Sequence, residues 1–167
     1  GGDGFVIARR LLGRGVSVRT ILLARREEIR GDARVNLDIL EKLGAAPAEI
    51  GADGGLSVVQ DAIESADLVV DALLGTGAQG PARGSVAATI DCVNLSGRPV
   101  VSVDIPSGLG ADQPDVPGPA VRAVLTVTFA LPKRSLVLFP AAAHAGAVRV
   151  VDIGIPRRLW ADAPLGV

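Results

Sequence analysis

The stretch that decides the fold is DLVVDALL, residues 67–74, which runs directly into GTGAQGP, residues 75–81. The first part is an apolar run of strand length that Asp71 interrupts, and the second part is a glycine-rich turn. A continuous aliphatic run without polar alternation is typical of a parallel strand that is buried on both faces. We therefore predict a parallel sheet with this turn at the carboxyl end of one strand.

The same kind of pattern continues in both directions along the chain. Strands are predicted over residues 16–23, 99–103, 121–130 and 147–153, and helices over residues 5–12, 31–43, 57–64 and 85–95. Residues 1–4 are expected to form a loop, and Ser57 to cap the third helix. In the second helix, Asp32 is the expected N-cap, and Val35, Ile39 and Leu43 are the expected buried face. Helices that alternate with strands favour a doubly wound α/β sheet with right-handed crossovers.

Composition excludes several classes of protein. A chain of 167 residues fits one domain, and 17 basic against 18 acidic residues leave no basic stripe that would bind nucleic acid. The single cysteine, Cys92, cannot form an internal disulfide, which fits a reducing compartment. No apolar run reaches the roughly 18 residues of a membrane span. We expect a soluble, cytoplasmic protein without nucleic-acid or membrane partners.

Three features fall at strand ends or helix starts: residues 1–4, residues 71–81 and residues 104–108. Open parallel sheets bind ligands at the carboxyl ends of their strands, and glycines let backbone N–H groups approach an anion closely. Taken alone, each feature is better explained as an ordinary tight turn. Three such features at one edge of one sheet favour a binding site.

Asp71 and Asp104 carry the sharper signal, because each lies at or near the end of a very apolar strand. An unpaired charge there would be costly, so such a carboxylate needs a cation, backbone donors or a proton. All three are typical of functional sites. For Asp104, which Ile-Pro-Ser-Gly follows, the alternative is a carboxylate that only caps a turn.

The motifs of this chain resemble, in their order, those of the NAD(P)H-hydrate epimerases, the YjeF N-terminal domain family. They are GGDG at 1–4, GDA at 31–33 with Asn36, DALLGTG at 71–77, VDIPSG at 103–108, TVTF at 126–129 with Lys133, and DIGIP at 152–156. The resemblance implies a Rossmann-like three-layer sandwich with a mostly parallel central sheet. It places the domain at residues 1–156, with its start missing, and a linker or tail at residues 157–167.

The family's activity implies an isomerase that interconverts the R and S forms of hydrated NADH and NADPH, with a potassium ion as cofactor. Residue by residue, the resemblance implies that Gly1, Gly2 and Asp3 contact the substrate. It implies that Asp71 and Ser107 bind potassium. It also implies that Asp104 contacts the reacting part of the substrate. The substrate's phosphates and ribose would lie against Gly75, Thr76, Gly77, Ala78, Gln79, Gly80 and Pro81.

Two asparagines of the family pattern, one of them a potassium ligand, would precede Gly1. We therefore expect an N-terminally truncated piece that binds potassium weakly. The resemblance also implies a fused or separate ADP/ATP-dependent NAD(P)HX dehydratase as partner, and a homodimer in the full-length protein. Val124 and Ser135 depart from the family's common Asp and Gly, at positions where no chemistry is expected.

The reaction that the resemblance implies gives Asp104 a catalytic role. Hydration places a hydroxyl on the ring carbon beside nitrogen, and that carbon inverts if hydroxide leaves and returns, or if the ring opens and recloses. Either route needs one acid/base group near the hydroxyl. We expect Asp104 to protonate the departing hydroxyl and to activate the returning water, while potassium holds oxygens and loops in place.

Two other functions are compatible with a fold of this class. A non-catalytic binding or scaffold module with the same fold would be favoured by loss of Asp104 or of the glycine-rich turn, and both are present. A dehydrogenase is disfavoured because Pro81 follows the glycine motif and Asp91 comes too soon for a ribose-binding acid.

For Lys133, structural pairing and a role at the rim of the site are equally supported, and the lone His144 is expected to be a loop residue.

Overall fold

The computed structural model describes residues 2–51, 55–78, 80–156 and 158. Gly1 and Gln79, both expected to contact substrate, lie outside these residues, as does all of the expected tail except Arg158. The helices are α1 (Gly2–Leu12), α2 (Gly31–Lys42), α3 (Leu56–Glu64), α4 (Gly84–Leu95) and α5 (Arg134–Val137), with short 3₁₀ turns at Arg26–Glu28 and Ala141–His144. Within the described residues, no helix is long and apolar enough to cross a membrane.

The strands form two parallel sheets, which confirms the predicted α/β class. One sheet has the order β3 (Val69–Asp71), β4 (Val100–Val103), β5 (Leu125–Phe129) and β6 (Ala147–Val151), and β1 (Ile21–Leu22) pairs with β2 (Ala48–Glu49) in the other. Every pairing is parallel. The carboxyl ends of β3, β4 and β5 therefore lie at one edge.

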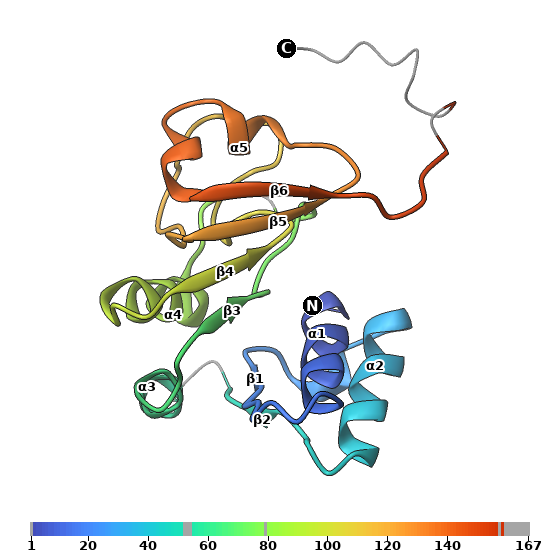
Figure 1. The fold of residues 1–167 in the computed structure, drawn as a ribbon. Helices are drawn as coiled ribbons and strands as arrows, with labels where there is room; N and C mark the ends of the chain where they lie inside the picture. The colour runs from blue at the N-terminus through green and yellow to red at the C-terminus, as the bar shows by residue number, and fades with distance from the viewer. Residues whose placement is uncertain (1, 52–54, 79, 157, 159–167) are drawn as a thin grey trace.

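Helices lie on both sides of the strands, as Figure 1 shows. On one side, α3 and α4 bury Val59, Ile63 and Ile90 in a cluster that includes Val100 of β4. On the other side, Phe5 and Ala8 of α1 pack with α2 and with Leu22 of β1. Two helical layers around parallel strands are the layered arrangement that the sequence predicts.

The predicted buried face of α2 is wrong. Val35 and Leu43 are 57% and 58% exposed and Ile39 is half-buried, whereas Leu37 and Leu40 are completely buried against α1. A Cβ atom added to Gly2 of α1 would lie 3.5 Å from Ala33, so the stripe of Ala33, Leu37 and Leu40 is the one that faces α1. The sequence of α2 carries two apolar stripes at helical spacing, and contact with α1 selects one of them.

Several predicted boundaries also differ from the structure. Residues 2–4 belong to α1 instead of forming a loop. Asp32 and Ser57 each lie inside the first turn of their helices, whose preceding residues are Arg30 and Gly55, so neither is the N-cap. The strands predicted over 16–23, 67–74, 121–130 and 147–153 are shorter, because apolar residues continue beyond the positions that pair with a neighbouring strand.

Candidate functional site

The three features that the sequence places at strand ends come together at one edge of the larger sheet. Asp71 is the last residue of β3, and Asp104 directly follows β4. The first turn of α1 reaches the same region, since a Cβ on Gly4 would lie 3.0 Å from the Cβ of Ala72. A segment that follows β5 adds Lys133, just before α5.

The carboxylate of Asp71 is the centre of a buried hydrogen-bonded cluster and is only 3% exposed. Its Oδ2 accepts hydrogen bonds from the Ser102 hydroxyl at 2.8 Å and from the Ser107 N–H at 2.9 Å. Its Oδ1 accepts from the Ser107 hydroxyl at 2.5 Å and from the Leu73 N–H at 3.4 Å. Protein donors thus compensate the buried charge and tie the end of β3 to the turn at residues 104–108.

The turn at residues 104–108 is held firmly by its neighbours. Gly108 has a φ of +99°, and a Cβ there would lie 2.2 Å from the carbonyl oxygen of Pro119, so only glycine fits. The Leu74 N–H donates to the Ser107 hydroxyl at 2.9 Å, which links this turn to the start of the glycine-rich segment. Gly75, Thr76 and Gly77 are exposed, so their backbone N–H groups are accessible to a ligand, while the Gly75 carbonyl oxygen accepts from the Ala78 N–H at 3.0 Å.

Asp104 occupies a strained and partly enclosed position. Its φ is 68°, a left-handed conformation that costs a non-glycine residue on the order of 1–2 kcal/mol. Its Oδ1 accepts from the Thr128 hydroxyl at 3.0 Å and from the Phe129 N–H at 3.1 Å, and it forms an ion pair with the ammonium of Lys133. The side chains of Asp104 and Lys133 are each 18% exposed, so water screens this pair only partly.

An apolar hollow of about 420 Å³ lies beside this edge. Its lining comes from one face of the sheet and from α1, and comprises Asp3, Val6, Ile7, Val70, Val101, Val103, Val127 and Phe129. Val103 directly precedes Asp104, and the Phe129 N–H binds its carboxylate. The hollow therefore adjoins the ion pair and offers apolar walls to a ligand.

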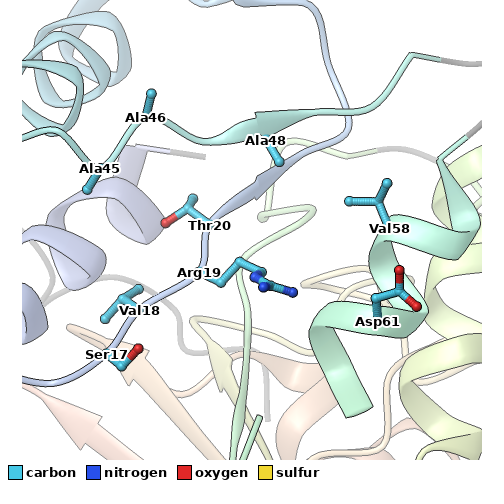
Figure 2. Close-up of a pocket in the computed structure, with 9 residues that line it drawn as sticks. All are labelled: Ser17, Val18, Arg19, Thr20, Ala45, Ala46, Ala48, Val58 and Asp61. Carbon is cyan, nitrogen blue, oxygen red and sulfur yellow. The ribbon is translucent and has the colours of Figure 1, made fainter. Parts of the chain in front are cut away.

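A second hollow, of about 480 Å³, does not belong to this edge. Figure 2 shows its lining, which includes Ser17, Arg19 and Thr20 ahead of β1 and Ala46 ahead of β2. These residues lie toward the amino ends of the parallel pair β1–β2, whereas ligands of such sheets bind at the carboxyl ends.

The donor set around Asp71 suits a hard monovalent cation in its chemistry. The described residues contain no group of three or more His, Cys, Asp and Glu side chains that could hold a metal ion. Potassium is bound by oxygen ligands alone. Three such oxygens lie close together here: the Ser107 Oγ is 2.5 Å from Asp71 Oδ1 and 3.3 Å from the Leu74 carbonyl oxygen. An ion there would compete with the two hydrogen bonds that Oδ1 accepts.

No role was predicted from the sequence for Ser102 or for Thr128, although Thr128 lies in the TVTF motif at 126–129. Both are completely buried polar residues in otherwise apolar strands, and they bind Asp71 and Asp104 respectively. A polar side chain that interrupts a buried strand needs a partner, so the Ser in VVSV and the second Thr in LTVTF were available signals.

Comparisons with known proteins agree with this architecture. The family described as YjeF-related protein N-terminus matches residues 1–135. The bifunctional NAD(P)H-hydrate repair enzyme Nnr of Moorella thermoacetica is 50% identical over 161 residues, covering 96% of this chain but only 30% of that enzyme. The NAD(P)H-hydrate epimerase of Pirellula staleyi is 38% identical over 159 residues, covering 95% of this chain and 70% of the epimerase.

A solved structure shares the fold. The crystal structure of the yeast protein ynu0 (YNL200c) superposes with a TM-score of 0.72 at 22% identity, over 93% of this chain and 63% of the yeast chain.

Proposed function

This chain belongs to the family described as YjeF-related protein N-terminus, and from that membership we propose that it interconverts the R and S forms of hydrated NADH and NADPH. The observation that carries the proposal is the ion-paired, strained carboxylate of Asp104 beside an apolar hollow. Backbone strain of this kind is typical of residues that a site must hold in one orientation. No observation favours the alternative of a non-catalytic scaffold module.

The substrate's polar and apolar parts match different parts of the edge. In this proposal, the phosphates and ribose lie along residues 75–81, where exposed glycines leave backbone N–H groups free to approach an anion. Gly2 and Asp3, in the first turn of α1, contact the substrate from the other side, and Asp3 lines the apolar hollow. The hydrated ring lies near Asp104. Gly1 and Gln79 keep their proposed contacts, outside the described residues.

Asp104 is the proposed catalytic residue. In its ion pair with Lys133, Asp104 is placed to accept a proton first, whereas it is predicted from the sequence to donate a proton first. The hydroxyl of the hydrated ring gives its proton to Asp104, and its O–H electron pair forms a carbonyl. The ring C–N bond breaks, and its electron pair stays on nitrogen, which takes a proton from a water molecule. The hydroxide that remains takes this proton back when the ring recloses. The carbonyl group then rotates about the C–C bond that joins it to the rest of the opened ring. The same steps in reverse close the ring on the other face of the carbonyl carbon.

Potassium is proposed to bind between the ends of β3 and β4, held by Asp71 and Ser107. The ion would orient substrate oxygens and neighbouring turns electrostatically, without activating a nucleophile. The residues that already hold these turns together are the same two, through the hydrogen bond between the Ser107 hydroxyl and the Asp71 carboxylate.

A dehydratase is the proposed partner activity. The Moorella thermoacetica relative is named a bifunctional repair enzyme and is more than three times as long as its matched part, since this chain covers 30% of it. We propose that the dehydratase acts on one of the two forms, either fused to this domain or as a separate protein. A homodimer and a cytoplasmic location are part of the same proposal.

The proposal is tested by mixing the chain with R-NADHX and a dehydratase specific for the S form. We expect the R form to disappear faster than without the chain. Asp104→Asn should lower the rate at least about tenfold, whereas Asp91→Asn, on the exposed side of α4, should not. An R form that is consumed at the uncatalysed rate would show that the assignment is wrong.

The route can be tested in the same assay run in H₂¹⁸O. Ring opening keeps the original oxygen on the substrate, whereas departure of hydroxide replaces it with oxygen from solvent. We expect the newly formed epimer to retain its oxygen, measured by mass spectrometry at early times. Incorporation of one solvent oxygen for each inversion would exclude the ring-opening route.

A further inference from the structure

The two oxygens of the Asp104 carboxylate have different surroundings. Oδ1 accepts from three groups: the Thr128 hydroxyl, the Phe129 N–H and the Lys133 ammonium. Oδ2 accepts no hydrogen bond from any residue in the described part of the chain. A carboxylate has about four lone-pair positions, so those of Oδ2 remain available to a ligand. The Asp104 side chain is 18% exposed, and Oδ2 is not among the buried side-chain oxygens that lack a partner in the described residues. One oxygen is therefore anchored, and the other is accessible.

The ammonium of Lys133 has no proton left for a ligand. A lysine ammonium carries three N–H donors. In this structure they point to Asp104 Oδ1, to the Thr128 hydroxyl oxygen at 3.0 Å and to the Phe129 carbonyl oxygen at 2.9 Å. All three acceptors belong to the protein, so Lys133 can affect the reaction only through the groups that it holds.

Lys133 is the charged member of the group that holds Oδ1. Hydrogen bonds between ionised partners are about twice as strong as neutral ones, and the partial burial of this pair limits screening by salt. Without Lys133, only two neutral donors would remain on Oδ1, and the Thr128 hydroxyl would lose its own donor. The carboxylate could then rotate, and a displacement of about 1 Å at a reacting group can cost about 10²-fold in rate.

We infer that Lys133 is a positioning residue, which anchors Oδ1 of Asp104 so that Oδ2 is the atom that exchanges the proton with the substrate. This inference rests on the proposed epimerase function. The inference goes beyond that function because it assigns a role to each oxygen of the Asp104 carboxylate and to Lys133. In Asp104→Asn, the amide oxygen can still accept from Lys133, but the nitrogen in place of Oδ2 cannot accept a proton.

The experiment measures kcat and KM for Lys133→Met in the coupled epimerase assay. We expect kcat to fall at least about tenfold while KM changes less than about threefold, because the substrate loses no direct contact. Lys133→Arg keeps the charge and should recover part of kcat, limited by its planar geometry. Thr128→Val should show a smaller loss of kcat, again with KM retained. Lys42→Met, at the exposed end of α2, is the matched control and should match the unsubstituted chain.

The double variant Asp104→Asn/Lys133→Met separates positioning from direct action. If Lys133 acts through Asp104, the double variant should be no slower than Asp104→Asn by more than about threefold. The inference would be overturned if the losses of the two single variants multiply in the double variant. It would also be overturned if Lys133→Met leaves kcat unchanged or changes KM alone. Each of these outcomes would leave the epimerase function intact. Melting curves identify any variant that fails to fold, and Lys133→Arg and Thr128→Val then decide the question. An unsubstituted chain without epimerase activity would overturn both proposals.

Discussion

Asp71 and Asp104 show how surroundings assign different roles to the same residue type. Both oxygens of Asp71 are engaged by hydroxyl and backbone donors, and its side chain is almost inaccessible. In Asp104, the donors gather on one oxygen only. Asp71 is therefore suited to holding turns in place, and Asp104 to exchanging a proton.

Potassium should stabilise this chain only weakly. The Oδ1 atom of Asp71 already accepts from the Ser107 hydroxyl and from the Leu73 N–H, so an ion must displace existing hydrogen bonds. We expect the melting temperature in potassium chloride to exceed that in sodium chloride of equal concentration by less than about 2 °C, which corresponds to less than about 1 kcal/mol. A potassium-specific increase of more than about 4 °C would mean that the cation site of this chain is complete.

At the scale of single elements, helix α2 shows how packing decides which stripe of a helix is buried. The apolar residues of α2 occupy more than one side of the helix, and their spacing alone selects none of them. The contact with α1 buries the side that carries Leu37 and Leu40. It does so because Gly2 and Ala33 are small enough to let the two helices approach closely.

This assignment predicts how α2 responds to truncation of its side chains. Leu37→Ala and Leu40→Ala should each lower the free energy of unfolding by about 2–5 kcal/mol, since each leaves a cavity in a fully buried position. Val35→Ala, at an exposed position of the same helix, should change it by less than about 0.5 kcal/mol. Urea denaturation measures both effects. A loss for Val35→Ala as large as that for Leu37→Ala would contradict the observed packing.

At the scale of the whole molecule, the arrangement of the layers places the candidate site at the carboxyl ends of the strands. It also leaves β6, at the side of the sheet, exposed in the described residues. Strand β6 is the last strand of its sheet in the described residues, and all five of its side chains are exposed. In Figure 1, β6 lies at the outside of the sheet, beyond β5. An exposed apolar edge strand is a site where chains can pair with one another.

Edge pairing predicts that a charge on β6 will reduce aggregation. Val150→Lys should slow the rise in light scattering at elevated temperature, because a lysine on an edge strand opposes pairing between chains. Its melting temperature should stay nearly unchanged, since Val150 is 46% exposed. Val16→Lys is the matched control, at the same 46% exposure but outside the sheet. If both substitutions slow the rise in light scattering equally, the added net charge, and not the position on the edge strand, explains the slower aggregation.

The sequence by itself determined the class of fold and the places where chemistry is expected. Apolar runs of strand length, helical spacing and stopping glycines are local patterns, so they predict α4 and β4 to within one residue of the observed bounds. A carboxylate at the end of a buried strand is also a local signal, and it places Asp71 and Asp104 at the carboxyl edge of the sheet.

Only the tertiary structure decided which groups these carboxylates meet. Ser107 reaches Asp71 across 36 positions of the chain, and Lys133 reaches Asp104 across 29. Which oxygen is anchored and which is accessible depends on the order of strands β3, β4 and β5, and on the turn that directs Asp104 into a left-handed conformation. Spacing along the chain predicts which residues share one strand or one helix. It contains no information on distances between strands, because those depend on how all the layers pack together.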